Sequence, residues 1–299
     1  MYSLAQIKTG LRNPWRTAVE LNTFVHSRFG RCDYNPAGID IFEQDWDNLI
    51  VLDACRYDEY ERQSPDGGRV ESRTSRAGAT YEFLTANFTG RELHDTVYVS
   101  ANPWYQKIRD QLGSSLHQYV PVRSKAGEEA DSIEELTVGP EPVSEKAREA
   151  NDNYPNKRLL IHYLQPHTPY LGPTGREEFE IKKGMWKQVK ESDVSDETLW
   201  QAYRENLELA LDSVSELIAD LPGKTVVTAD HGEHLGDRSG PIPVKTYGHF
   251  VGLYTEELVK VPWHVYDNGE RKEIVSEAPE SDSATEDVDR QLEALGYKL

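Results

Sequence analysis

Four short hydrophobic runs, each ending in polar residues, form the clearest pattern along the chain. They are NLIVLDACRYD at 48–58, DTVYVSANPW at 95–104, RLLIHYLQPHTPY at 158–170 and KTVVTADHGEH at 224–234. Short apolar runs rich in β-branched residues are typical of strands buried on both faces of a parallel sheet. The sequence therefore predicts four such strands, each leading into a polar segment.

Helical patterns alternate with these runs, most clearly at 203–218. Apolar residues recur there every three or four positions, at Leu207, Leu211, Val214 and Ile218. Alternating strands and helices predict an α/β fold with a mostly parallel, doubly wound sheet and helices on both faces. Ligands bind beyond the carboxyl ends of the strands in such sheets. We therefore expect the polar residues at the predicted strand ends to converge: Asp53, His162, His167, Asp230 and His231.

The chain divides into three expected parts. Residues 1–45 are predicted to form a helical extension, 46–268 the main α/β domain, and 269–299 an acidic linker with a short helix. Two polar stretches, 104–157 and 171–200, lie inside the main domain. We expect them to form insertions and specificity loops, because loops on a rigid scaffold commonly carry binding residues.

Acidic residues outnumber basic ones, with 52 Asp and Glu against 33 Lys and Arg and a formal net charge of −19. Such a surface repels polyanions, which excludes non-specific binding of nucleic acid. The acidic residues are spread along the whole chain, which favours a high-salt cytoplasm over a local acidic interaction segment. Cys32 and Cys55 are too few for a disulfide framework, which fits a reducing interior.

The sequence contains no run of about 18 apolar residues, so no transmembrane span is predicted. The first 30 residues also lack the continuous apolar core of a signal peptide, and we expect a cytoplasmic protein. This basic, aromatic N-terminus either lies on a membrane as an amphipathic helix or packs against the main domain, and we favour packing. Nothing in the sequence indicates the oligomeric state.

Asp230 and His231 follow the last hydrophobic run and precede a Gly and a Glu. Carboxylate oxygen and imidazole nitrogen together suit a divalent cation, although an Asp can equally cap a helix and a His can be a core residue. Asp53, at the end of NLIVLD, offers either a second carboxylate ligand or the N-cap of a helix beginning at CRYDEY. Further imidazoles come from His162, His167 and His249.

The order of these motifs over 46–268 resembles the alkaline phosphatase superfamily, particularly its sulfatase-like members. NLIVLDACRYD resembles the first strand with its metal-binding Asp, and HYLQPHTPY the strand that ends in an active-site His. TVVTADHGEHLGD is similar to the strand and Asp-His metal motif that follow a long helix. YGHFVGLYTEELVKVPWHV resembles the segment in which a His or Lys reaches the site, here His249 or Lys245. The resemblance implies a catalytic α/β domain.

Two positions depart from the sulfatase pattern. Many sulfatases carry a second Asp directly after the first, where this chain has Ala54. The family's CxPSR-type motif, which yields formylglycine, has no counterpart, since the nearest string is SRTSR at 72–76 with Thr74 in place of Pro. An ordinary sulfatase mechanism is therefore not expected.

Thr80 is the preferred nucleophile, with Ser75 and Ser72 as alternatives. The small residues at 77–79 would let the backbone approach an anion, and Thr80 precedes YEFL at an expected helix start, where amide groups stabilise negative charge. Phosphodiesterase-like and lipoteichoic-acid-synthase-like relatives use a Thr in this setting, whereas the competing interpretation is an ordinary N-cap. Two guanidinium groups could hold substrate oxygens, at Arg56 and Arg76.

The resemblance implies a metal-dependent hydrolase of phosphate or sulfate esters that forms a covalent intermediate on Thr80 or a nearby Ser. Asp53, Asp230 and His231, with Thr80, would hold one divalent ion (Mn, Mg, Zn or Ca). One ion is favoured over two, because a two-metal site usually has an Asp where this chain has His167. The remaining imidazoles, of His162, His167 and His249, would bind a second ion or protonate the leaving alkoxide.

Two alternatives remain at this stage. One keeps the fold but transfers a phospho-alcohol head group to a glycan or lipid acceptor. The other is a binding protein in glycan or surface assembly that has lost turnover. Small-molecule, glycan-linked and lipid-linked esters are all compatible substrates.

The acidic composition predicts that salt stabilises the fold. Screening of mutual repulsion should raise the unfolding temperature, Tm, steadily from low to molar KCl. Thermal unfolding followed by circular dichroism measures this directly. A Tm that does not change with KCl would show that the charge has no such role.

Overall fold

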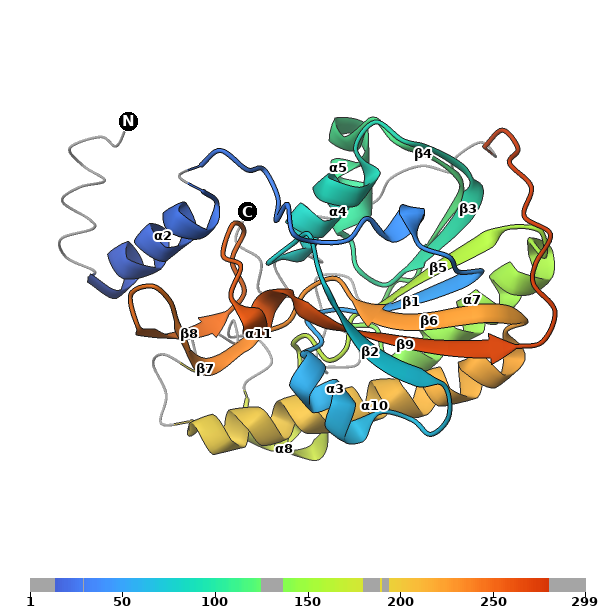
Figure 1. Ribbon diagram of the computed structural model, residues 1–299. Helices are drawn as coiled ribbons and strands as arrows, with labels where there is room; N and C mark the ends of the chain where they lie inside the picture. The colour runs from blue at the N-terminus through green and yellow to red at the C-terminus, as the bar shows by residue number, and fades with distance from the viewer. Residues whose placement is uncertain (1–13, 29, 125–136, 180–188, 190–193, 280–299) are drawn as a thin grey trace.

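The computed structural model describes residues 14–28, 30–124, 137–179, 189 and 194–279. Its centre is a seven-stranded sheet in the order β2-β9-β6-β1-β5-β3-β4 (Figure 1). The four predicted strands are confirmed as β1 (Asn48–Leu52), β3 (Glu92–Ser100), β5 (Arg158–Tyr163) and β6 (Gly223–Ala229). The hydrophobic pattern did not indicate β2 (Arg69–Thr74), β4 (Ser115–Pro121) or β9 (Lys260–Asn268), although the family resemblance implied a strand beginning at Val261 and Pro262.

Parallel pairing joins the five strands β4, β3, β5, β1 and β6, whereas β9 runs antiparallel to both β6 and β2. The sheet is therefore mixed but mostly parallel, which confirms the predicted fold class. β2 and β9 do not stand out in the hydrophobic pattern, because polar and charged residues interrupt β2 and Pro262 lies within β9. Their antiparallel pairing places both at one side of the sheet.

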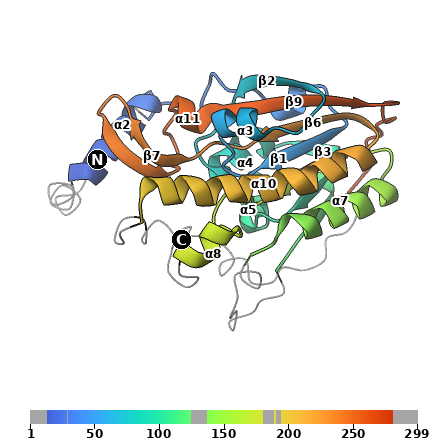
Figure 2. The ribbon, with the colours of Figure 1, turned by 90° about the horizontal axis from the view of Figure 1, so that it is seen from below.

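Side chains of the central strand alternate between two cores. Ile50 and Leu52 join a cluster with residues of α7 (Pro140–Asn153) and α10 (Asp196–Asp220). Leu49 and Val51 face the opposite cluster, with residues of α4 (Thr80–Phe88) and α5 (Trp104–Leu112). The helices thus cover both faces of the sheet, as Figure 2 shows for α10 and α7 on one side. This two-sided burial explains why β1 is a continuous apolar run.

α10 extends the predicted helix at 203–218 in both directions. Its N-cap is Ser195, whose side chain accepts a hydrogen bond from the Thr198 amide, and acidic residues occupy the first turn. The buried face includes Tyr203, Asn206 and Leu207 at helical spacing. Tyr203 and Asn206 are polar. The Tyr203 hydroxyl donates to the Ala54 carbonyl, next to Asp53, and the Asn206 side chain donates to the His167 carbonyl.

A second, two-stranded sheet lies beside the main one, formed by β7 (His234–Ser239) and β8 (Val244–Gly248). Helix α2 (Pro14–His26), within the expected N-terminal extension, packs against this hairpin. Asn22 binds the hairpin through Ser239 and Ile242, and His26 contacts the Gly240 carbonyl. Packing of the extension, which the sequence favoured, is thus seen for α2.

The chain after β9 runs along the sheet without regular structure up to residue 279. The Val275 amide donates to the Asn156 carbonyl, and Lys157 Nζ donates to the Val275 carbonyl and Glu277. The expected C-terminal helix and most of 180–193 lie outside the described residues. No helix in the described part of the chain is long and apolar enough to cross a membrane.

Candidate active site

The three central strands bring the predicted residues to one edge of the sheet. Asp53 directly follows β1, and Asp230 and His231 directly follow β6. Leu52 pairs with Ala229 in the parallel register, so Asp53 and Asp230, the residues that follow this pair, lie side by side. His162 lies on β5, which flanks β1 on its other side. Asp53, Asp230 and His231 are all fully buried.

Each aspartate has one oxygen held by the protein and one without a hydrogen-bond partner. Asp230 Oδ1 accepts from the amides of Ala54 (3.0 Å) and His231 (2.8 Å). Asp53 Oδ2 accepts from the Asn102 side chain at 2.6 Å. The other oxygens, Asp53 Oδ1 and Asp230 Oδ2, are buried and have no hydrogen-bond partner among the described residues. Burial of an unpaired carboxylate oxygen is costly, so these atoms mark where a ligand belongs.

His231 presents a defined nitrogen to the same space. Its Nδ1 lies 2.7 Å from the Gly232 carbonyl, which can only accept, so Nδ1 carries the proton. Nε2 is therefore the acceptor nitrogen. It lies 3.2 Å from Thr80 Oγ1, 3.3 Å from Asp230 Oδ2 and 3.8 Å from Asp53 Oδ1. The Thr80 hydroxyl consequently donates to His231 Nε2.

Thr80 is the first residue of α4, and its side chain is fully buried. The N-cap is Ala79, with no side-chain cap, so Thr80 does not cap this helix in the way the competing interpretation required. Gly78 lies so close to the Leu253 carbonyl that an added Cβ would come within 2.5 Å of it. Small residues before Thr80 therefore allow the helix start to press against the loop at 249–254.

Glu82 fixes this close approach between two loops. Its Oε2 accepts from the Gly78 amide at 2.7 Å, and its Oε1 accepts from the Tyr254 hydroxyl. The carboxylate thus joins the start of α4 to the segment that carries His249.

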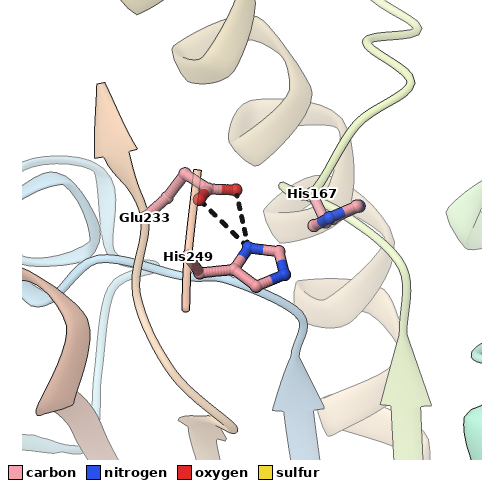
Figure 3. A group of neighbouring side chains, drawn as sticks. All are labelled: His167, Glu233 and His249. Carbon is pink, nitrogen blue, oxygen red and sulfur yellow. Dashed lines mark hydrogen bonds and ion pairs between the residues drawn. The ribbon is translucent and has the colours of Figure 1, made fainter. Parts of the chain in front are cut away.

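His167, Glu233 and His249 form a second cluster (Figure 3). Glu233 follows the Asp-His pair, and its two oxygens lie 3.1 and 3.3 Å from His249 Nδ1. His167 approaches from the other side, on the loop after β5. The His231 and His249 rings are 4.4 Å apart between centroids, so the second cluster adjoins the first.

The His167 loop is held by a buried amide on α10. Asn206 Nδ2 donates to the carbonyls of Pro166 (3.1 Å) and His167 (3.0 Å). His167 Nδ1 contacts the Thr168 carbonyl at 2.7 Å and therefore carries a proton. Both peptide bonds that lead into Pro166 and Pro169 are cis. These contacts fix the orientation of the His167 ring and make Nε2 its acceptor nitrogen.

Burial keeps the site histidines neutral. It lowers the pKa values of His162, His167 and His249 to about 4 each. Burial also raises the pKa of Glu233 to about 7, against the opposing effect of nearby histidines. For Asp53, burial and then the charge of Asp230 raise the pKa well above its usual range, while the hydrogen bond from Asn102 opposes the rise.

The donor sets fit divalent cations. Asp53, His162 and Asp230 offer ligand atoms within 4.8 Å of one another, and so do His167, Glu233 and His249. Among the described residues, no Lys or Arg side chain pairs with any of these three carboxylates. A buried group of carboxylates and neutral imidazoles lacks a countercharge, which a divalent ion would supply. Asp53 and Asp230 would hold one ion together with His162 or with His231, whose Nε2 lies 3.3 Å from Asp230 Oδ2, and the second cluster would hold another.

Arg56 lies beside the site but uses its donors on the protein. Nε and Nη2 bind Asp58, and Nη1 binds Asp237 and the Glu233 carbonyl. The guanidinium also lies over the Trp200 ring, 4.7 Å from its centroid. These contacts tie Arg56 to the backbone of Glu233, and its predicted role in holding substrate oxygens stays a prediction.

The remaining predicted residues lie around the site without pointing to a substrate. Arg76 binds Asp40 and the Ala86 carbonyl. The Ser75 hydroxyl donates to the backbone carbonyl of Asp230 and accepts from the Ala77 amide.

Two others belong to sheet elements. Ser72 lies on β2, opposite Pro262 of β9. Lys245 lies on β8 and pairs with Asp196 at 2.6 Å, with about half of its side chain exposed. The geometry thus favours Thr80 over Ser72 and Ser75 as the nucleophile.

Three residues of the site were not singled out from the sequence: Tyr98, Asn102 and Glu233. Asn102 follows β3, which ends at Ser100, so the strand-end rule that identified Asp53 could have found it. Glu233 stands in the quoted DHGEH string, and its carboxylate type was a signal. The Tyr98 hydroxyl, on β3, contacts His162 Nδ1 at 2.8 Å. No sequence motif indicates this contact.

Comparison of the sequence with protein-family models gave no match, and comparison with curated proteins gave none. Solved structures do show similarity. The C-terminal periplasmic domain of phosphoethanolamine transferase EptC from Campylobacter jejuni has a TM-score of 0.48 at 15% identity, covering 74% of this chain and 78% of that one.

Two further structures are similar at the same low level. The 2-O GAG sulfatase BT1596 has a TM-score of 0.48 at 13% identity, covering 76% of this chain and 65% of that one. A protein in the alkaline phosphatase superfamily from Vibrio parahaemolyticus has a TM-score of 0.43 at 12% identity, covering 85% and 70% respectively.

The lowered histidine pKa values predict a pH dependence of stability. Between pH 6.5 and about 4 the unfolded chain binds a proton at His162 that the folded chain does not, so this residue destabilises the fold as pH falls through that window. In the metal-free protein, His162→Asn should therefore flatten the fall in the free energy of unfolding. Urea unfolding at several pH values measures both slopes, and parallel curves would contradict the prediction.

Proposed function

We propose that this chain is a metal-dependent hydrolase of phosphate or sulfate esters of the alkaline phosphatase superfamily, with Thr80 as nucleophile. One observation carries the proposal. The Thr80 hydroxyl begins a helix and faces His231 Nε2 at 3.2 Å, beside two buried carboxylate oxygens that have no partner. The family motifs in the sequence meet at this point, at the carboxyl ends of adjacent strands.

Thr80 supplies the attacking oxygen. Its Oγ1 would form an ester bond to phosphorus or sulfur while the bond to the leaving alcohol breaks, and water would then release the product. In the structure the hydroxyl donates to His231 Nε2, and a bound ion would replace this hydrogen bond by taking both atoms as ligands. The α4 amides, with the helix dipole, favour an anionic ester at this end of the helix. A divalent ion held by Asp53, Asp230 and His231 would lower the pKa of the Thr80 hydroxyl and neutralise charge on the substrate.

His167, Glu233 and His249 would hold a second ion. The sequence favoured one ion because His167 stands where a two-metal site usually has an Asp. Glu233 changes this expectation, since it brings a carboxylate to the same cluster from a different position. The neutral histidines, with pKa values of about 4, need lose no proton to bind a cation at neutral pH.

Hydrolysis and head-group transfer differ only in the acceptor that attacks the Thr80 ester. The full burial of Thr80 and His231 restricts access of large acceptors to the site. We therefore favour water as the acceptor. Adding glycerol or ethanolamine to the assay distinguishes the two, because a transferase would form the new ester at the expense of free phosphate.

Thr80→Ala should abolish turnover while the metal stays bound. Loss of the nucleophile lowers kcat by about a thousandfold or more in enzymes with covalent intermediates. The assay uses p-nitrophenyl phosphate, bis(p-nitrophenyl) phosphate and p-nitrophenyl sulfate with Mn, Zn, Mg or Ca in high KCl.

Thr85→Ala is the matched control, because Thr85 lies on the same helix and its hydroxyl donates to the Glu82 backbone carbonyl. Thr80→Ser should retain part of the activity. Full activity of Thr80→Ala would reassign the nucleophile, and inactivity of the unaltered protein on every substrate would favour a binding protein.

Elemental analysis should find two divalent ions per chain. Asp53→Asn should remove one of them and Glu233→Gln the other, because each substitution withdraws a buried carboxylate from one cluster. Glu149→Gln, an exposed glutamate on α7, serves as the control. One ion in the unaltered protein that survives Glu233→Gln would limit the second cluster to proton transfer.

A further inference from the structure

The Tyr98 hydroxyl lies beside the candidate metal site, against His162. It is 2.8 Å from His162 Nδ1, and both side chains are buried. β3 and β5 are neighbours in the sheet, and Ser100 pairs with His162 in their parallel register (Figure 1). Tyr98 stands two residues before Ser100 and shares its face of β3, so its long side chain reaches His162 diagonally.

The other ring nitrogen of His162 is turned to the unpartnered carboxylate oxygens. Nε2 is buried and has no hydrogen-bond partner among the described residues. It lies 3.8 Å from Asp230 Oδ2, which is too far for a hydrogen bond. The ligand atoms of Asp53, His162 and Asp230 lie within 4.8 Å of one another. Three buried polar groups therefore meet in one space, and a shared cation would satisfy all of them.

Aromatic packing holds Tyr98 in this position. Its ring centroid lies 5.6 Å from that of Phe88, 5.3 Å from that of Tyr105 and 5.7 Å from that of Tyr119. Burial raises the pKa of the Tyr98 phenol well above its usual range, so the hydroxyl keeps its proton and can both donate and accept. A Phe would pack equally well here, and the informative feature is therefore the hydroxyl.

We propose that Tyr98 is a positioning residue of the candidate metal site and that it makes His162 a ligand of the ion between Asp53 and Asp230. A histidine that binds a metal ion through one nitrogen almost always donates the N–H of the other to an oxygen or a water, which fixes its ring and its tautomer. The Tyr98 oxygen accepts from Nδ1–H in this arrangement, and Nε2 presents its lone pair to the ion. This role rests on the metal dependence proposed above.

Asn102 supports the other side of the same site. Its side chain donates to Asp53 Oδ2 at 2.6 Å, which leaves Oδ1 for the ion. Ser100 Oγ donates to the Asn102 carbonyl and accepts from the Asn102 amide. Tyr98, Ser100 and Asn102 stand at every second position, so β3 and the residues just after it orient ligands that its neighbours carry.

The test is calorimetric titration of the metal-free full chain with Mn²⁺. Tyr98→Phe should raise the Kd of one ion about tenfold to a hundredfold, because it removes the acceptor of the His162 N–H. Tyr60→Phe is the matched control. Tyr60 is also buried, and its hydroxyl lies 3.0 Å from a histidine Nδ1 outside the site, that of His264. This variant should bind Mn²⁺ as the unaltered protein does.

A double-substitution cycle separates this role from general damage to the core. If Tyr98 acts through His162, then His162→Ala should weaken binding at least as much as Tyr98→Phe, and the two together no more than His162→Ala alone. Additive losses would overturn the inference, because they would show that Tyr98 acts independently of His162. Equal Tm values of metal-free Tyr98→Phe and Tyr60→Phe establish that the fold is intact.

Two further results would count against the inference. Unchanged Mn²⁺ binding by Tyr98→Phe, or by His162→Ala alone, would overturn it and leave the proposed metal dependence standing. Absence of Mn²⁺ binding by the unaltered protein is a different failure, since it would contradict the metal dependence itself.

Discussion

Two buried carboxylates that face the same space without a basic partner are the constraint on which the rest of the site depends. Asp53 and Asp230 directly follow two adjacent parallel strands. Because Leu52 pairs with Ala229, the register places the two aspartates close together. Burial and mutual repulsion raise the pKa of Asp53. Two buried carboxylates this close together are unfavourable as two anions unless a cation lies between them. The pair is therefore a candidate site for a metal ion.

The surroundings hold these carboxylates in place. Ala54 adopts a φ of 60°, unusual for a residue with a Cβ, which turns its amide to Asp230 and its carbonyl to the Tyr203 hydroxyl on α10. Asn102, after β3, fixes Asp53 from another strand. The site therefore rests on strand ends and a long helix, and its geometry follows from the packing of the whole sheet.

The sequence predicted what depends on strand-end position and on residue type. Asp53, Asp230 and His231 were identified in this way, Thr80 was identified as a Thr at an expected helix start, and the structure brings the four together. The role of Arg56 could not be predicted, because Asp58 and Asp237 occupy its donors through folding, which no local pattern records. His167 and His249 were named as possible ligands of a second ion, but Glu233 was not singled out. Its carboxylate comes from the segment between β6 and β7 and not from the position of His167, so only the three-dimensional arrangement shows that the three residues meet.

The most direct test of these ideas is anomalous diffraction from crystals of the protein grown with Mn²⁺ or Zn²⁺. The strongest anomalous peak should lie between the unpartnered oxygens of Asp53 and Asp230 and Nε2 of His231, within bonding distance of all three. A saturated crystal with no peak at this position, or with the carboxylates bridged by a protein cation instead, would contradict the central claim that this pair of buried aspartates exists to hold a metal ion.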